Sequence, residues 1–242
     1  MGLILDKYEQ ALAYEIFLWL EYAEIDEQIR NAKTILDIGW HIGLFALYCL
    51  WLKTFNSPTF KKDDIYNIKN FVRKIMPHWE ITIHLFEPVS SNIEKAFNLL
   101  DWLWKYVNIN KLWISDSLSE DKLFLSAKSM QSSRRTSFLN NGSSSEICRF
   151  IRLDSFFKDK GIVTVDVMKI DVEGDEFIII ESLSDNILSN IKCLIIEYHL
   201  IDNESADKLR SMISRLEHIY KVVYKKEAVY DKRVGIIVCK NK

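Results

Sequence analysis

The sequence predicts an α/β fold built on a mainly parallel, Rossmann-like sheet. Short apolar runs rich in β-branched residues alternate with helix-like segments along most of the chain, a pattern typical of parallel strands joined by helices. The first run ends in a glycine turn at residues 37–43, and the last two runs are joined by a short polar loop. Because so short a loop joins neighbouring antiparallel strands, the chain should end in an antiparallel hairpin.

The first third of the chain predicts a helical lead-in followed by a strand, a turn and a helix. Residues 1–33 repeat apolar side chains at helical spacing, which indicates a segment that packs on the rest of the fold. A strand at 34–39 then leads to an apolar helix at 44–52. Residues 53–80 predict an insert that forms one extra surface helix, because apolar side chains between 65 and 75 lie on one helical face.

The remainder continues the alternation. A strand at 81–88 precedes a helix that Ser91 and Glu94 should open as a capping box. The later elements are expected as strands at 111–116, 167–174 and 193–199, helices at 177–188 and 209–216, and hairpin strands at 220–225 and 234–240. Residues 117–150 are expected to be a variable loop region, with the serine-rich stretch 126–145 as a mobile surface loop. No linker divides the chain, so residues 1–242 are expected to form one domain.

The composition restricts the partners. Lys and Arg number 32 against 34 Asp and Glu, so the chain as a whole has no basic field that would attract nucleic acid or an anionic membrane. The longest apolar run, residues 43–52, is too short to span a bilayer. The amino-terminal residues lack the features of a secretory signal, and the four cysteines are widely spaced, so we expect a cytoplasmic protein with reduced thiols and a small-molecule partner.

The glycine turn and the end of the second strand predict a nucleoside site. Ligands of open parallel sheets bind at the carboxyl ends of the strands, and Asp37, Gly39 and Gly43 lie at such an end. Their spacing, D-x-G-x-x-x-G, differs from the dinucleotide pattern G-x-G-x-x-G and argues against a nicotinamide enzyme. Glu87 ends the second strand, where a carboxylate can accept hydrogen bonds from both hydroxyls of a ribose.

The string K169-I-D-V-E-G-D-E176 carries the strongest chemical signal. An apolar strand ends in several carboxylates, which repel one another unless a cation lies close to them. That cation can be a sulfonium or ammonium of a cofactor, a divalent metal, or Lys169. Asp175 and Glu176 are expected to stabilise a helix amino terminus, whereas Asp171 and Glu173 remain available for a ligand.

The chain resembles the FkbM-type methyltransferases, a family of class I enzymes that use S-adenosylmethionine. The matching strings are I35-L-D-I-G-W-H-I-G43, L85-F-E-P88 with Asn92, R152-L-D-S155, M168-K-I-D-V-E-G-D-E176 and I196-E-Y-H199. The resemblance implies the seven-stranded class I sheet. It also implies that Asp37, Gly39 and Gly43 surround the cofactor, that Glu87 binds its ribose, and that Asp171 lies beside the methionine ammonium or the transferred methyl group.

Four further residues belong to the expected cofactor site: Asn92, Asp116, and the neighbours Trp40 and His41. The family usually has Ala-Asn where this chain has Trp40-His41, so the indole is expected either to cover the cofactor or to obstruct its binding. The resemblance makes O-methylation of a sugar, glycolipid or other small hydroxyl-bearing acceptor the leading hypothesis. The alternative is a catalytically inactive binding or interaction protein of the same fold.

The catalytic candidates lie near the ends of the fourth and fifth strands. A hydroxyl acceptor needs a base, and His199 is the favoured candidate, followed by Glu173, with Asp171 beside them. Asp171, Glu173, Glu197 and His199 can also supply oxygen and nitrogen ligands for a divalent cation such as Mg²⁺. The sequence therefore leaves both a base and a metal site open.

Overall fold

Two sheets and ten α-helices make up the described part of the chain, which comprises residues 5–39, 41–55, 59–77, 80–125, 132–133, 144–227 and 231–242 of a computed structural model. The larger sheet contains β1 (Thr34–Ile38), β2 (Thr82–Phe86), β3 (Val107–Asn110), β8 (Val165–Ile170), β9 (Ile191–His199), β10 (Tyr220–Glu227) and β11 (Val234–Asn241). The smaller sheet contains β4 (Trp113–Ser115), β5 (Ser119–Leu125), β6 (Ser132–Ser133) and β7 (Ser144–Arg152). The helices are α1 (Lys7–Phe17), α2 (Asp26–Asn31), α3 (Leu44–Thr54), α4 (Lys62–Tyr66), α5 (Ile68–Val72), α6 (Ser90–Leu99), α7 (Leu153–Lys160), α8 (Glu176–Ser182), α9 (Asp185–Ser189) and α10 (Ser205–Ile219), with short 3-10 turns η1 (Ala23–Ile25) and η2 (Trp104–Tyr106).

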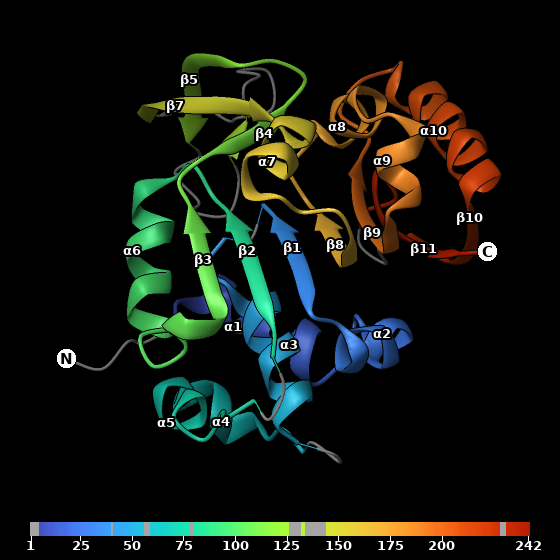
Figure 1. The fold of residues 1–242 in the computed structure, drawn as a ribbon. Coiled ribbons are helices and arrows are strands. Elements are labelled where there is room, and N and C mark those ends of the chain that lie inside the picture. Colours follow the sequence, from blue (N-terminus) through green and yellow to red (C-terminus); the bar gives the residue numbers. More distant parts are fainter. Residues whose placement is uncertain are drawn as a thin grey trace.

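The larger sheet has the strand order β3-β2-β1-β8-β9-β11-β10 (Figure 1). Its strands are parallel except β11, which pairs antiparallel with both β9 and β10. This arrangement confirms the predicted Rossmann-like class I methyltransferase fold, with its mainly parallel seven-stranded sheet, its carboxyl-terminal hairpin and its helical lead-in.

Alternating side chains of the strands feed two separate cores, one on each face of the sheet. Ile35 packs with α1 to α6 on one face, whereas its neighbour Leu36 packs with α7 to α10 on the other. Val167 and Met168 divide in the same way. Because strands that are buried on both faces need apolar side chains at nearly every position, they read as continuous apolar runs in the sequence.

The strand register gathers the site residues at one edge of the sheet. Ile38 at the end of β1 is level with Phe86 of β2 and with Ile170 of β8. The residues that follow these strands therefore lie side by side. In Figure 1 the smaller sheet lies above this edge, beyond the arrowheads of β1, β2 and β3.

The structure corrects the predicted third strand. Residues 113–115 pair with β7 in the smaller sheet. The strand that pairs with β2 at the edge of the larger sheet is β3. β3 is an edge strand with the alternating sequence V-N-I-N, and Asn108 is exposed. An edge strand buries fewer side chains, so it lacks the apolar run by which the other strands were predicted.

Three local predictions also differ from the structure. The insert forms two short helices, α4 and α5, which break at Asn67 and bury apolar side chains against the core rather than forming one surface helix. The predicted capping box is absent at α6, which begins at Ser90 after Val89 without a side-chain cap. The region 117–150 contains β5 and β7, whereas most of the predicted serine-rich loop lies outside the described residues.

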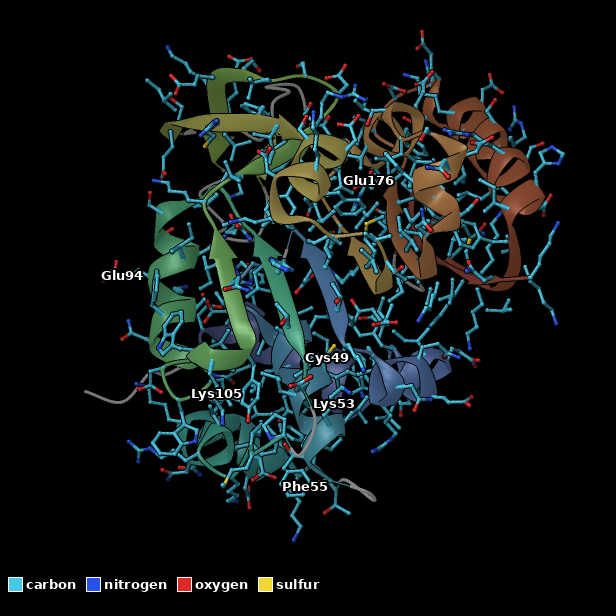
Figure 2. All side chains as sticks on the ribbon, in the orientation of Figure 1. Cys49, Lys53, Phe55, Glu94, Lys105 and Glu176 are labelled. Carbon is cyan, nitrogen blue, oxygen red and sulfur yellow. The ribbon has the colours of Figure 1, made fainter. Side chains whose placement is uncertain are left out.

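The four cysteines are free and buried, as predicted (Figure 2 labels Cys49). Among the described helices, none has the length and apolar character that a bilayer span requires.

Candidate active site

A cavity opens at the carboxyl edge of the larger sheet. It is lined by residues from α1 and the turn after it, from the loops after β1, β2 and β8, and from α6, β4 and β9: Leu12, Glu15, Glu21, Gly39, His41, Glu87, Asn92, Trp113, Asp171, Val172, Glu173 and Glu197. Six of these side chains are carboxylates, and none of the described lining residues is Lys or Arg. The cavity therefore suits a ligand with positive charge.

Seven predicted residues meet in this cavity: Gly39, His41, Glu87, Asn92, Asp171, Glu173 and Glu197. Sequence analysis assigned only packing to the lead-in, yet Glu15 and Glu21 of that segment face the same space. Burial raises the pKa of Glu21 to about 7, and the Glu15 charge acts in the same direction. Nothing in the local pattern distinguishes these two acids from the many surface charges of an amphipathic helix.

At the base of the cavity, the backbone after β1 lies close to the backbone after its parallel neighbour β8. The Gly39 N–H donates to the Phe86 carbonyl, and the Asp171 N–H donates to the Ile38 carbonyl. A Cβ atom on Gly39 would lie 1.6 Å from the Asp171 carbonyl oxygen. Position 39 therefore requires a glycine, because the neighbouring backbone leaves no room for a side chain. Gly39 also lines the cavity.

Lys169 lies between two of the predicted acids. Its Nζ is 2.9 Å from Asp171 Oδ2 and 3.9 Å from Asp37 Oδ1. Burial opposes the charge of Lys169, but the carboxylates of Asp171 and Asp37 raise its pKa. Asp37 is fully buried below the cavity, and burial raises its pKa to about 7. Lys169 therefore supplies the compensating cation for Asp37 and for one oxygen of Asp171.

The end of β2 forms a polar recess suited to a ribose. Glu87 is 4% exposed, and its Oε1 accepts the Val89 N–H at 2.9 Å. Burial raises the Glu87 pKa to about 8, against the opposing effect of hydrogen-bond donors on Val89, Asn92 and His41. In the described part of the chain, Asn92 Oδ1 and both ring nitrogens of His41 lack a hydrogen-bond partner. Buried polar atoms without partners are costly, so these groups are arranged for a ligand that supplies them.

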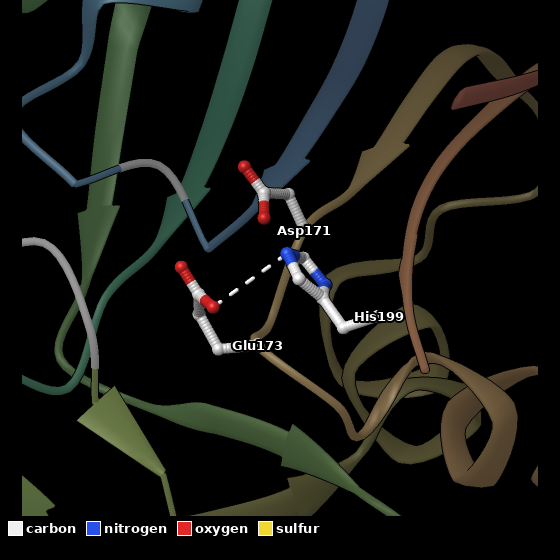
Figure 3. A group of neighbouring side chains, drawn as sticks. All are labelled: Asp171, Glu173 and His199. Atoms are coloured by element: carbon white, nitrogen blue, oxygen red, sulfur yellow. Dashed lines mark ion pairs between the residues drawn. The ribbon is translucent and has the colours of Figure 1, made fainter. Parts of the chain in front are cut away.

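The two predicted base candidates form a row of side chains that leads from the cavity into the core. Glu173 lines the cavity, and its Oε2 lies 3.5 Å from His199 Nε2 (Figure 3). His199 is 5% exposed and stands behind Glu173 rather than in the lining. Its Nδ1 lies 2.9 Å from Oε1 of Glu176, a fully buried residue.

The charges of His199 and Glu173 depend on each other. Burial works against a charged His199, but Glu176 and then Glu173 raise its pKa well above the ordinary value. Burial raises the Glu173 pKa to about 7, and the nearby His199 charge limits that rise. Glu173 thus ionises near neutral pH, the range in which a general base works best.

Glu176 has a role that the sequence did not reveal. It was expected to stabilise a helix amino terminus, as was Asp175. Both residues lie there, with Asp175 as the N-cap of α8 and Glu176 as its first residue. In addition, Glu176 accepts hydrogen bonds within the loop before α8, and Asp175 Oδ2 accepts the indole N–H of Trp113. The position of Glu176 opposite His199 depends on the pairing of the loop with β9, which no local pattern predicts.

Asp171, Glu173 and His199 are the candidate metal group, with one donor atom from each lying within 4.8 Å of the others. Glu197 is not part of that group. A divalent ion at Asp171 would compete with the Lys169 ammonium for that carboxylate, and it would need His199 in its neutral form, although two carboxylates hold its proton. The residues therefore fit an ammonium and a proton better than a resident metal ion.

Two other predicted site residues that the structure describes, Gly43 and Asp116, do not line the cavity. Gly43 immediately precedes α3 with φ 85°. Asp116 is exposed, where its carbonyl accepts from Arg152 and its carboxylate from the Ser115 hydroxyl. Trp40 lies outside the described residues.

Comparison with known proteins agrees with the geometry. A family model, Methyltransferase FkbM domain, matches residues 37–223. A search of curated proteins finds no match.

Solved structures show the same fold at low identity. An rRNA methylase from Streptococcus thermophilus is 7% identical with a TM-score of 0.51, over 93% of this chain and 96% of that one. An O-methyltransferase from Bacillus cereus in complex with SAH is 10% identical with a TM-score of 0.50, over 99% and 93%. The methyltransferase FkbM from Methylobacillus flagellatus KT is 11% identical with a TM-score of 0.50, over 98% of this chain and 56% of that one. Since the family model covers most of the sequence, the chain belongs to the FkbM family of S-adenosylmethionine-dependent methyltransferases.

Proposed function

We propose that this protein methylates a hydroxyl group of a small acceptor, such as a sugar or the headgroup of a glycolipid, with Glu173 as the proton acceptor. The observation that carries the proposal is the position of Glu173 on the cavity wall, with His199 3.5 Å behind it. Loss of a hydroxyl proton makes the oxygen a better nucleophile, and Glu173 ionises in the range where that transfer is efficient.

The cofactor-binding roles follow from the polar groups around the cavity. S-adenosylmethionine, when bound, supplies an electrophilic methyl group on a sulfonium. Glu87 would accept the ribose hydroxyls, Asn92 and His41 offer unpartnered polar atoms beside it, and Asp171 has one oxygen left by Lys169 for the methionine ammonium. The acceptor oxygen forms the new bond to carbon, the carbon–sulfur bond breaks with its electron pair remaining on sulfur, and Glu173 receives the proton.

The discriminating experiment is transfer of a labelled methyl group from S-adenosylmethionine to a panel of glycans, glycolipids and RNA. We expect label in a hydroxyl-bearing small molecule or glycolipid and none in RNA. Glu173→Gln should lower kcat about 100-fold or more while the cofactor still binds, because a positioned base contributes about 10²–10⁴ in rate. His218→Gln, which changes an exposed histidine, is the control.

Two results would contradict the proposal. Label that appears in RNA alone would assign a different acceptor class. A protein that binds neither S-adenosylmethionine nor S-adenosylhomocysteine would support the alternative of an inactive relative.

Methyl transfer should also survive removal of metal ions. The protein treated with excess EDTA and desalted is expected to keep its kcat. The reason is that Lys169 already pairs with Asp171, and protonated His199 already pairs with Glu173. Loss of activity that Mg²⁺ restores would instead assign a divalent ion to Asp171, Glu173 and His199.

A further inference from the structure

One buried side chain touches both the ring of His199 and the loop that carries Glu173. Glu176, labelled in Figure 2, is fully buried at the first position of α8. Its Oε1 accepts the backbone N–H of Val172 at 3.1 Å and of Gly174 at 3.0 Å, and lies 2.9 Å from His199 Nδ1. The two backbone donors are the residues on either side of Glu173.

From this geometry we infer that Glu176 is the positioning residue for proton transfer, with a single carboxylate fixing both His199 and the Glu173 loop. The inference rests on the proposed methyl transfer, because it assigns Glu176 a role in that reaction. Glu176 lines no part of the cavity, so it acts through the residues it holds.

The loop contact keeps Glu173 in an unfavourable backbone conformation. Glu173 has φ 55° and Gly174 has φ 113°. A left-handed conformation is unfavourable for a residue with a Cβ, so it persists only where other contacts enforce it. The hydrogen bonds from Val172 and Gly174 to Glu176 are such contacts, and they aim the Glu173 side chain along the cavity wall.

The imidazole contact decides which nitrogen of His199 faces Glu173. A carboxylate at Nδ1 keeps the proton on that nitrogen and leaves Nε2 toward the other partner. Figure 3 shows Nε2 directed at Glu173. The ring is thereby held between two carboxylates, and its charge in turn lowers the pKa of Glu173.

Five acids among the described residues act on the charge of His199, and two of them are paired with cations, Asp171 with Lys169 and Asp231 with Arg233. Glu176 faces it from α8, Glu173 and Asp171 from the loop after β8, Glu197 from its own strand β9, and Asp231 from the turn before β11. Glu176 alone among them holds Nδ1 at hydrogen-bond distance. Its substitution should therefore change the state of the ring more than substitution of the others.

The test is Glu176→Gln, with Glu181→Gln as the control on the exposed side of the same helix. Glutamine keeps an oxygen for the Val172 and Gly174 donors but removes the charge. We expect S-adenosylmethionine to bind within about twofold of wild type and kcat to fall about tenfold or more. Because a neutral His199 no longer lowers the Glu173 pKa, the acid limb of the kcat–pH profile should move to higher pH.

The direction of that movement separates this inference from the proposed function. Unchanged kcat and an unchanged pH profile would overturn the role of Glu176. A fall in kcat with the acid limb moved to lower pH would keep Glu176 as the positioning residue but make His199, not Glu173, the proton acceptor.

A measurement on the wild-type protein needs no acceptor. Nitrogen-15 histidine NMR, with the resonance assigned through His199→Gln, should show Nδ1 protonated throughout the titration. A neutral His199 that carries its proton on Nε2 would overturn the inference, even if methyl transfer is later demonstrated. The tautomer result stands even if no acceptor in the panel is methylated.

Discussion

At the scale of single residues, the site is defined by carboxylates that the fold keeps away from water. Asp37 and Glu87 are 0% and 4% exposed, and burial raises the pKa of each by several units, to about 7 and about 8. Donors on Val89, Asn92 and His41 offset part of the cost of burying Glu87, and two ligand hydroxyls would add further hydrogen bonds to its oxygens. Burial of the Glu87 carboxylate therefore costs more free energy in the free protein than in the complex.

Replacement of Glu87 with Ala should weaken the cofactor and its product equally, because both carry the same ribose. The expected loss is about 1–3 kcal/mol, the cost of leaving two ligand hydroxyls without a charged acceptor. Calorimetric titration with S-adenosylmethionine and S-adenosylhomocysteine measures it, with Glu94→Ala on α6 as the control (Figure 2). Unchanged affinity would remove Glu87 from the ribose site.

Several of the cavity residues that the sequence singled out come directly after a strand. Glu87, Asp171 and Glu173 were recognised because each comes directly after an apolar run, and the register of β1 with β2 and β8 brings those ends together. Glu21 and Glu176 were not assigned to the site. Their roles depend on how distant segments pack, and a carboxylate on a helix or in a turn has no local feature that marks its partner.

At the scale of elements, the close approach of Gly39, after β1, to Asp171, after β8, sets the geometry at the base of the cavity. Two glycines with left-handed φ provide a direct comparison, because Gly39 meets the Asp171 carbonyl while nothing lies within 4 Å of a Cβ on Gly161. The two positions separate the cost of backbone conformation from the cost of a collision.

Gly161→Ala should cost only the conformational penalty, about 1 kcal/mol, and leave cofactor binding unchanged. Gly39→Ala carries a similar penalty and also forces β1 away from Asp171, so it should destabilise the protein by several-fold more and abolish cofactor binding. Thermal unfolding of the two variants measures the difference. Equal unfolding temperatures would show that this close approach tolerates a side chain.

The lead-in is a second element that the cavity depends on. Glu9 of α1 is 1% exposed, and its Oε1 is 2.5 Å from Lys95 Nζ on α6. Lys95→Met should therefore leave a buried carboxylate without its cation, lower the free energy of unfolding by about 1–3 kcal/mol, and weaken the cofactor because α1 carries Leu12 and Glu15. The exposed Lys7→Met is the control, and an effect no larger than that of Lys7→Met would show that α1 is held by its apolar face alone.

Strands were predicted best where both of their faces are buried. β1, β2, β8 and β9 have continuous apolar sequences and were located within a few residues. The edge strand β3 was missed, and Trp113–Ser115 was placed in the wrong sheet because a short apolar strand looks the same in either. α4 and α5 share one apolar face, so the break at Asn67 was invisible to a periodicity argument.

At the scale of the whole molecule, the concentration of acids at one edge couples folding, cofactor binding and pH. Asp37, Glu87 and Glu173 all have pKa values raised by burial, to about 7, about 8 and about 7. By contrast, a hydrogen bond from Arg152 lowers the pKa of Asp154 on the surface. The raised and lowered groups act in different pH ranges, so their effects on stability can be separated.

The unliganded protein should lose stability as the pH rises from about 6 to about 8.5. A group whose pKa is raised on folding binds its proton more tightly in the folded state, so its contribution is complete at low pH and is lost as the pH rises through the folded value. For Glu87 that loss spans the range from about 4.5 to about 8 and amounts to about 5 kcal/mol at most, because each unit is worth about 1.4 kcal/mol. Asp154 contributes in the opposite sense, but only below about pH 4.

A bound sulfonium should reverse this trend, because a cation favours the ionised acids that burial disfavours. We therefore expect the rise in unfolding temperature on adding S-adenosylmethionine to be larger at about pH 8.5 than at about pH 6, and larger than with the neutral thioether S-adenosylhomocysteine at each pH. Glu87→Gln should flatten the pH dependence of the unliganded protein, since it removes one of the raised groups. Thermal unfolding with and without each ligand measures all three effects. If stability without ligand instead increases toward pH 8.5, these carboxylates are already ionised in the free protein, and the cavity must hold another source of positive charge.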